Sequence, residues 1–476
     1  MNKSIQGGED NKRLVLLVTT LGSFMTPFDS NAATLAIPSI GSDLGGGLIL
    51  LSWISVGYLL SLTTFLLVFG RLGDNKGRKL LFVTGVVVFT FSSVVSGLSG
   101  SIYQLIVARL IQGMGASMMS GNAVAFLTSV FPSSERGKVV GIVTGATYAG
   151  LSAGPVLGGL LISHFGWRSI FYVNIPIGLV TASICYFKTH ETLRVNEEAS
   201  FDVLGGLTLT ISLSSLLASV TLGQTGILSR VYVFALMLLA ILSFLLFIFI
   251  EKKSSSQPII DLRLFTENKM FAFSNATAFL NYLASYGIGF LLSLYLQTVL
   301  MLEPHQAGLV MLSQPLLMTI VSPISGHISD RMQPRRLASI GLAVMSGAML
   351  ILSAATIDTS LQSIVMILAV LGAGYGLFSS PNTSAVMGSV SKEALGVGSG
   401  TLSTMRFLGQ SLSLVLVTFI LAGNLSSGVP LVGRGPLNVS VQEFLYGFRI
   451  TLQTCAIIAA GAVVISLGRG HNHSKA

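Results

Sequence analysis

Charged side chains are scarce in this sequence. Only 9% of its 476 residues are Asp, Glu, Lys or Arg, whereas 51% are hydrophobic. A soluble domain carries roughly 25% charged residues, because water must solvate its surface. The scarcity excludes a water-soluble globule of this size and indicates that lipid surrounds most of the protein.

Cysteine is also rare, and both copies, Cys185 and Cys455, lie inside apolar stretches. Two such cysteines provide neither a disulfide framework nor a zinc-binding spacing, so we expect both to be small packing residues. The phosphate-binding pattern G-x-x-x-x-G-K-[ST] is missing too, because Pro132 stands where Gly137-Lys138 would need the first glycine. With no nucleophile–base constellation either, the sequence predicts no enzyme, no ATP-driven pump and no bound cofactor or metal.

The formal net charge is +9, which in a soluble protein would suggest a nucleic-acid partner. Here, however, the Lys and Arg residues fall in short loops between apolar runs. No basic stretch is interleaved with aromatic residues. We therefore expect no nucleic-acid partner.

Apolar runs of roughly 18–25 residues recur along the whole chain, and each can cross about 30 Å of hydrocarbon as a helix. The polar residues 1–13 lead into a run longer than the core of a signal peptide, which we interpret as the first span. The sequence predicts an all-α integral membrane protein with about fourteen spans, at 14–37, 50–70, 79–99, 103–127, 138–162, 167–187, 203–222, 230–250, 270–299, 305–329, 336–356, 362–388, 395–421 and 447–468.

The basic residues are distributed unevenly across this predicted bundle. An even number of spans puts both termini on one side, and 21 of the 27 Lys and Arg residues fall on that side. Because cytoplasmic loops carry the excess of Lys and Arg, we predict a plasma-membrane protein with cytoplasmic N- and C-termini. The remaining basic residues are Arg109 and Arg406 within spans, and Arg168, Arg230, Arg434 and Arg449 on the other side.

The two ends of the chain repeat one pattern. GRLGDNKGRK at 70–79 and GHISDRMQPRR at 326–336 each close the second span of a six-span set, with Gly70 and Asp74 matching Gly326 and Asp330. Repeated six-helix halves are typical of transporters that bind substrate between the halves, although duplication without transport is an alternative. We divide the chain into an N-terminal six-helix bundle (1–187), a linker with two additional helices (188–269) and a C-terminal six-helix bundle with a tail (270–476).

The 70–79 loop has a physical interpretation of its own. Gly70 and Gly73 permit a tight turn, and we expect Asp74 near the start of the third helix, where the helix dipole favours a carboxylate. Arg78 and its basic neighbours can pair with acids or lipid phosphates. The loop is either a latch that opens when the halves move or a basic loop that only fixes topology, and the repeated Gly-Asp spacing favours the latch.

A ridge of small residues follows on the fifth span. Gly150, Gly154 and Gly158 are spaced to lie on one helix face, which lets another backbone approach closely. Pro155 removes one helical hydrogen bond and permits a bend. Close packing alone would explain this ridge, so its role in transport stays open at this point.

Asp29 and Arg109 are charged residues deep within spans. At 1.5 Å per residue, Asp29 lies roughly 22 Å above the start of its helix, and Arg109 lies roughly 9 Å below the other surface. In a core of about 30 Å the two depths nearly coincide. A charge in the membrane is expensive, so each is expected to be functional and paired. The pair is either a proton-coupling site or a static brace, and motion that changes desolvation or the arginine's distance would load and release a proton.

These motifs together resemble the major facilitator superfamily and, within it, the fourteen-helix drug:proton antiporters. The 70–79 loop fits the superfamily's loop signature, and Arg109-Leu-Ile-Gln112-Gly113-Met-Gly115 is similar to its arginine motif. Gly150-Leu-Ser-Ala-Gly154-Pro155-Val-Leu-Gly158-Gly159, followed by Trp167-Arg168, Phe171, Asn174, Pro176 and Gly178, resembles the antiporter motif and its continuation. The resemblance implies that the fifth helix helps to set transport direction, and that conformational change involves Gly70, Gly73, Asp74, Gly77, Arg78, Gly150, Gly154, Pro155, Gly158, Gly159, Gly326, Asp330 and Arg335.

The surroundings of Asp29 depart from that family's pattern. Asn31 and Thr34 exchange the expected positions of Thr and Asn, and Ser285 stands where a repeated acid would lie. Both exchanged residues still offer hydrogen bonds. Arg406, roughly 16 Å into its helix, either binds an anionic group or pairs with a polar helix partner. The proposed coupling and substrate residues are Asp29, Asn31, Thr34, Arg109, Gln112 and Arg406, with Asn275, Asn281, Gln297, Gln314, Asn382 and Gln410 as further pathway candidates.

The favoured function is a secondary transporter that exports lipophilic or cationic small molecules in exchange for protons, without a cofactor and as a monomer. The fifth-helix motif and the fourteen spans favour this function by resemblance. A symporter or facilitator for uptake of one metabolite is the alternative. A membrane sensor that transports nothing is the third.

Overall fold

The computed structural model describes residues 2–190, 202–225, 229–253, 263–390, 395–425 and 441–469, which are almost entirely helical. A backbone in lipid must satisfy its own hydrogen bonds, and helices do so within one segment. The first set of helices is α1 (Asn2–Leu44), α2 (Leu48–Lys76), α3 (Arg78–Gly97), α4 (Ile102–Val130), α5 (Ser133–Phe165), α6 (Ser169–Tyr172) and α7 (Asn174–Lys188). The middle pair is α8 (Val203–Thr225) and α9 (Arg230–Lys253). The last set is α10 (Arg263–Glu267), α11 (Lys269–Ser285), α12 (Gly287–Leu294), the π-helix η1 (Tyr295–Val299), α13 (Pro304–Arg331), α14 (Pro334–Leu352), α15 (Leu361–Met387), α16 (Leu395–Gly423) and α17 (Val441–Leu467).

Local sequence explains several helix ends. The Ser101 side chain accepts a hydrogen bond from the Gln104 backbone at the start of α4, and Asn268 does the same for Phe271 at the start of α11. Glu303 and Gln306 form a capping box at the start of α13. Glycine with positive φ ends α5, at Gly166 (φ +78°), because such a conformation costs little without a Cβ.

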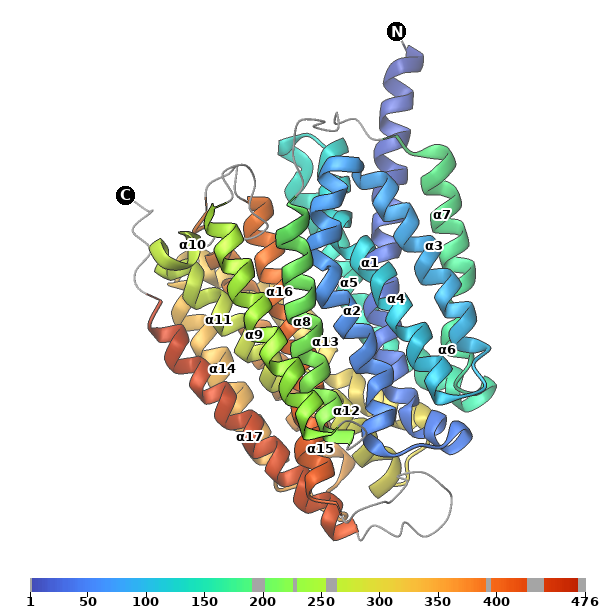
Figure 1. Ribbon diagram of the computed structural model, residues 1–476, viewed down its shortest axis with the longest axis vertical. Helices are drawn as coiled ribbons and strands as arrows, with labels where there is room; N and C mark the ends of the chain where they lie inside the picture. The colour runs from blue at the N-terminus through green and yellow to red at the C-terminus, as the bar shows by residue number, and fades with distance from the viewer. Residues whose placement is uncertain are drawn as a thin grey trace.

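The helices form two packed groups that lie side by side (Figure 1). One group is α1–α7, held by contacts of α1 with α5 and of α4 with α2 and α3. The other is α11–α17, held by contacts of α13 and α14 with α15, of α14 with α17 and of α11 with α16. The groups meet where α5 contacts α13, α2 contacts α16 and α1 contacts α12. The middle helix α8 contacts both α2 and α16, and α9 packs on α8.

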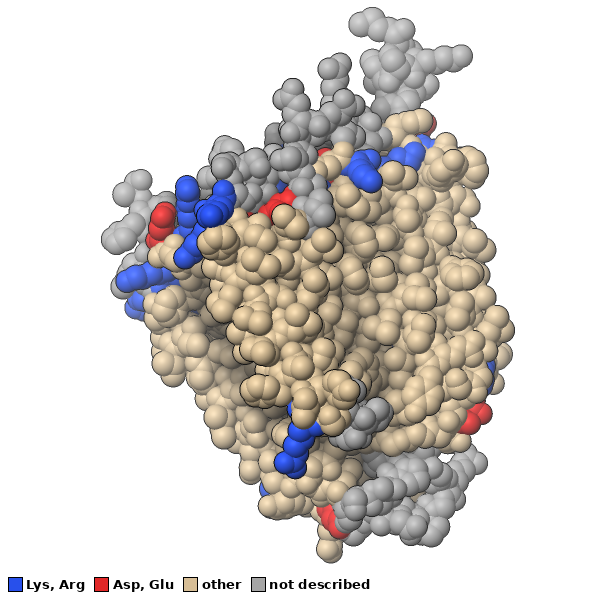
Figure 2. All heavy atoms as spheres, viewed as in Figure 1, with Lys and Arg blue, Asp and Glu red and all other residues tan. Residues whose placement is uncertain are grey.

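The start of α1 and the end of α17 lie at one end of the bundle, which we call the terminal end (Figure 1). Lys and Arg gather along this end in Figure 2, while a broad band without charged side chains covers the middle of the visible face. Such a band is the surface expected where lipid tails contact a protein.

Eleven of the described helical segments are long and apolar enough to cross a membrane. Each of the fourteen predicted spans coincides with a helix or with consecutive helices, but the runs 14–37, 103–127 and 203–222 fall outside these eleven. They lie in α1, α4 and α8, of which α8 contains a shorter apolar stretch, Leu204–Val220. The helices α1 and α4 carry Asp29 and Arg109, so polar side chains lower their apolar character.

Candidate functional site

The predicted pair of Asp29 and Arg109 is present, and both side chains are completely buried. Asp29 lies on α1, and its Oδ2 accepts a hydrogen bond from Nη1 of Arg109 on α4. Its Oδ1 accepts two more, from Nε2 of Gln112 at 3.0 Å and from Nδ2 of Asn174 at 2.8 Å. Three helices, α1, α4 and α7, therefore converge on one carboxylate.

Arg109 is surrounded by further partners. Its Nη1 also donates to Oε1 of Gln112 at 2.7 Å, and its Nε donates to the carbonyl of Ile54 on α2 at 3.1 Å. The guanidinium lies 4.3 Å from the ring centre of Tyr58 and 5.7 Å from that of Phe171. Its Nη2 has no hydrogen-bond partner among the described residues.

The glycines that follow Arg109 explain how α4 approaches its neighbours. A Cβ at Gly113 would overlap the carbonyl of Tyr58 on α2, and one at Gly115 would lie 2.6 Å from the backbone nitrogen of Phe89 on α3. The segment from 109 to 115 thus places an arginine and a glutamine in the interior and keeps two backbones in close contact. Gln112 extends the network to α3 through Ser93 Oγ at 2.9 Å.

Asn31 and Thr34 use their hydrogen bonds elsewhere. Asn31 donates to the carbonyl of Leu151 on α5 at 3.0 Å. Thr34 donates to the carbonyl of Ser30 at 2.9 Å and lies 3.4 Å from Ser55 Oγ on α2. The structure therefore groups Asp29, Arg109 and Gln112, whereas Asn31 and Thr34 join α1 to its neighbours.

Asn174 and Tyr58 belong to the site but are not among the predicted site residues. In the sequence, Asn174 is noted only as one residue of the segment after Trp167-Arg168 that continues the antiporter motif. Depth is the signal that identifies it, because a residue near the start of the run 167–187 lies about 10 Å into its helix, close to the depth of Arg109. Tyr58 has no comparable signal, since a tyrosine in an apolar helix is usually a packing residue.

The loop after α2 differs from the prediction. Gly70 and Gly73 do not form the turn, because both lie inside α2, which continues to Lys76. The turn is at Gly77, where φ is +106°. Gly73 is required for another reason, since a Cβ there would overlap the side-chain amide of Asn122 on α4.

The prediction for Asp74 is also wrong. It lies in the last turn of α2, not at the start of α3, and the helix dipole does not favour a carboxylate there. Arg78 compensates, since its Nε and Nη2 donate to Oδ1 of Asp74 at 2.9 and 2.8 Å. Arg78 also donates to the carbonyl of Ala125 on α4 at 3.2 Å. These hydrogen bonds join helices of the first group, and the role of a latch remains a prediction.

Replacing Gly77 by alanine is expected to lower the melting temperature of the purified protein by several degrees. Its φ of +106° is a conformation that costs a residue with a Cβ on the order of 1–3 kcal/mol. Gly70→Ala is the control, because a Cβ there would only reach ordinary contact, 3.5 Å from the carbonyl of Gly121. Thermal unfolding in detergent measures both, and equal melting of the two variants would contradict the assignment of the turn.

The equivalent segment in the second group is arranged differently. Gly326 lies in α13, where a Cβ would come 2.8 Å from Ser380 Oγ on α15. Arg335 lies in the first turn of α14, and its Nε donates to Oε1 of Gln333 at 3.0 Å. The side chain of Asp330 lies outside the described residues.

The glycine ridge of α5 packs against α1. A Cβ at Gly150 would lie 2.5 Å from the carbonyl of Phe24, one at Gly154 2.7 Å from Cβ of Asn31, and one at Gly158 2.8 Å from Cβ of Ala32. The next face of α5 meets α13. There, a Cβ at Gly159 would lie 2.6 Å from the carbonyl oxygen of Pro304 on α13. In the other direction, a Cβ at Gly308 on α13 would overlap the carbonyl oxygen of Pro155 on α5.

At the end opposite the termini, α5 and α13 join the two groups. Besides the contacts of Gly159 and Gly308, Gln297 of η1 donates to the carbonyl of Leu35 on α1 at 3.0 Å. Toward the terminal end, the face of α5 that carries Pro155 no longer packs closely against α13. Gly141 and Gly137 lie on that face, and a Cβ at either would meet no described atom within 4 Å. The groups are therefore closed together at one end of this face.

Arg406 lies apart from the Asp29 network. Its Nη2 donates to Thr383 Oγ1 on α15 at 2.6 Å, and its guanidinium lies 5.9 Å from the ring centre of Tyr282 on α11. A polar helix partner is thus present, and the side chain is only half-buried. Of the other pathway candidates, Asn275, Asn281 and Asn382 are buried, each with an unpaired side-chain oxygen.

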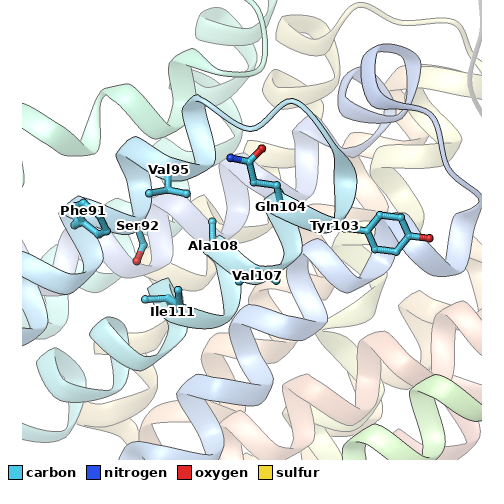
Figure 3. Close-up of a pocket in the computed structure, with 8 residues that line it drawn as sticks. All are labelled: Phe91, Ser92, Val95, Tyr103, Gln104, Val107, Ala108 and Ile111. Atoms are coloured by element: carbon cyan, nitrogen blue, oxygen red, sulfur yellow. The ribbon is translucent and has the colours of Figure 1, made fainter.

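A pocket of about 330 Å³ lies between α3 and α4 (Figure 3). Its lining is apolar, and Phe91, Tyr103 and Val107 are mostly exposed, so it opens to the surface where lipid is expected and not between the two groups. Ser92 and Ala108 are chain neighbours of Ser93 and Arg109, which belong to the interior network. The complete lining is Phe91, Ser92, Val95, Tyr103, Gln104, Val107, Ala108 and Ile111.

The sequence matches the family model described as Major Facilitator Superfamily over residues 19–274 and again over 274–469. The chain belongs to this superfamily.

Two curated relatives illustrate its place in the superfamily. The chain is 31% identical over 415 residues to "Riboflavin transporter RibZ" of Clostridioides difficile (strain 630), covering 87% of this chain and 89% of that protein. It is 32% identical over 418 residues to "Multidrug resistance protein Stp" of Mycobacterium tuberculosis (strain ATCC 25618 / H37Rv), covering 87% and 76%.

The fold agrees with a solved transporter structure. The chain superposes on a bacterial homolog of the human lysosomal transporter Spinster, in an inward-facing and unoccupied conformation, with a TM-score of 0.70 and 14% identity. The superposition covers 98% of this chain and 99% of that chain. The protein is thus a multi-pass membrane transporter of the major facilitator fold, with a small-molecule substrate, and not an enzyme.

Proposed function

We propose that this protein exports small amphipathic molecules in exchange for protons by alternating access. The observation that carries the proposal is the buried Asp29, an ionisable group that is paired with Arg109 and also bonded to Gln112 and Asn174. Antiport needs one site whose protonation changes between two conformations. A carboxylate whose arginine has other partners meets this need, because Arg109 remains bonded to Gln112 and Ile54 when Asp29 is neutral.

The proposal includes a topology of fourteen spans, with α1, α4 and α8 crossing beside the eleven apolar segments. Both termini lie in the cytoplasm, because Lys and Arg gather at the terminal end (Figure 2). The transporting halves are residues 1–187 and 270–476. The segment 188–269 adds two helices, and α8 contacts both halves. The contacts at Gly159 and Gly308 then close the extracellular end in this conformation.

Export is supported by the relatives named for drug resistance, such as Stp. Uptake or export of one metabolite is the second candidate, which the similarity to RibZ favours. In both cases the substrate passes between the halves, and the halves close at one end at a time.

The test is proton release upon addition of substrate. Purified protein in vesicles, with an imposed pH gradient and a pH-sensitive dye, is expected to release protons when a transported amphipathic dye or antiseptic is added. Proton-free exchange of labelled compound would replace antiport by facilitated transport. Proton movement in the same direction as the compound would replace it by symport.

A further inference from the structure

Arg406 lies beside an aromatic pair of the C-terminal half, Tyr282 of α11 and Tyr375 of α15. The hydroxyls of Tyr375 and of Tyr148 on α5 lie within electrostatic range of its guanidinium. The rings of Tyr282 and Tyr375 pack edge to face, with centres 5.6 Å apart. Tyr148 lies on the face of α5 that carries Pro155 and meets Gly308 of α13, so we place this half-buried arginine toward the seam between the halves.

Within the described ranges, no carboxylate neutralises the charge of Arg406. Asp29 and Arg109 neutralise each other. The one hydrogen bond of Arg406 to a described residue is the Nη2 contact to Thr383, whereas a guanidinium has five donors. An intramembrane cation with unused donors requires an anion or a strong acceptor.

We propose that Arg406, Tyr282, Tyr375 and Tyr148 form the substrate subsite and that they select planar aromatic molecules with an anionic group. The guanidinium fork binds a carboxylate-like group through two parallel hydrogen bonds, and the tyrosine rings pack against the substrate's ring system. Tyrosine rings alone would also attract a cation, but the adjacent Arg406 repels it. The inference rests on the proposed transport function and narrows the sequence-based expectation of a lipophilic or cationic substrate to an aromatic anion.

Two xanthene dyes of opposite charge test this preference. Fluorescein is an anion and rhodamine 123 a cation, with nearly the same ring system, and fluorescence anisotropy measures their binding to the purified protein. The wild type is expected to bind fluorescein about tenfold more tightly or better. Arg406→Gln is expected to lose most of that preference, with fluorescein bound more weakly and rhodamine 123 bound at least as tightly as by the wild type, and Arg406→Glu is expected to reverse the preference.

Arg449→Gln is the matched control, since Arg449 is an exposed arginine of α17. It is expected to bind both dyes like the wild type. Retained rhodamine binding and an unchanged melting temperature show that Arg406→Gln is folded. If Arg406→Gln is unfolded, the subsite is judged from the dye preference of the wild type and from dye binding by Tyr282→Phe, which keeps the aromatic ring.

Preference of the wild type for rhodamine, or equal loss of both dyes in folded Arg406→Gln, would overturn the anionic subsite. The proton-release assay separates this inference from the proposed function. Proton release with cationic compounds alone would retain antiport and reject the subsite. Selective fluorescein binding without proton release would retain the subsite and reject antiport.

Discussion

Replacing Asp29 by asparagine is expected to abolish proton-driven accumulation while substrate binding at the Arg406 cluster survives. One charge crossing 100 mV supplies about 2.3 kcal/mol, enough for roughly a fifty-fold gradient. Without an ionisable group at position 29 the expected steady-state gradient is none, which makes this the largest effect proposed for a single substitution. Vesicles loaded with a pH indicator and a transported dye measure both quantities at once.

The asparagine has a second consequence, which a single variant cannot separate from the first. It leaves the fully buried Arg109 without its counter-ion, and breaking a buried pair in this way typically costs about 3–5 kcal/mol. The double variant Asp29→Asn/Arg109→Gln removes both charges and keeps hydrogen-bonding side chains. We expect it to recover most of the melting temperature and to exchange substrate down its gradient, still without moving protons.

These variants separate a proton carrier from a structural brace. If the double variant accumulates substrate against its gradient, Asp29 only braces α1 against α4, and coupling must lie elsewhere. Asp43→Asn is the matched control, because Asp43 also pairs with an arginine, Arg168 at 2.6 Å, but in a half-exposed position. It is expected to transport and to release protons like the wild type.

The depth of charged residues can be predicted from the sequence, but their direction around the helix cannot. The fixed rise of a helix places Asp29 and Arg109 at one level, and the structure pairs them. The same reasoning cannot tell which side of α1 faces α4. It therefore groups Asn31 and Thr34 with Asp29, although they bond to Leu151 and Ser30.

Glycine is ambiguous for a related reason. In the string 70–79, several glycines could end a helix, and only the packing distinguishes Gly77, which has a positive φ, from Gly73, which makes room for Asn122. The Arg406 cluster is the least accessible of all from sequence. It depends on the packing of α11 with α15 and α16 and on Tyr148 of α5 across the seam, and no local pattern in the sequence encodes that arrangement.

Replacing Gly308 by valine is expected to hold the protein open at the end opposite the termini and to reduce transport at least tenfold. A Cβ at Gly308 would overlap the carbonyl of Pro155 on α5, and overpacking a tight contact costs roughly 1–3 kcal/mol or more. Since about 1.4 kcal/mol shifts an equilibrium tenfold, the cost falls on the conformation in which α5 and α13 touch. Each half should still fold, because the overlap lies between the halves.

A cysteine at position 293 reports the expected opening. Ser293 is fully buried in α12 and lies 3.4 Å from the carbonyl of Thr34 on α1, so it bridges the halves near the same end. Ser293→Cys is nearly isosteric, and the native Cys185 and Cys455 are buried and should not react. We expect labelling by a membrane-impermeant maleimide to become about tenfold faster in the Gly308→Val background.

Two further glycines determine whether the effect is conformational. A Cβ at Gly461 in α17 would meet nothing within 4 Å, so Gly461→Val should change neither labelling nor transport. Gly154→Val places the same bulk inside the N-terminal half, against Asn31 and Phe28, and should lower the melting temperature without exposing position 293. If Gly308→Val behaves like Gly154→Val, the contact between α5 and α13 is part of one rigid body. In that case it cannot be the point at which the halves separate.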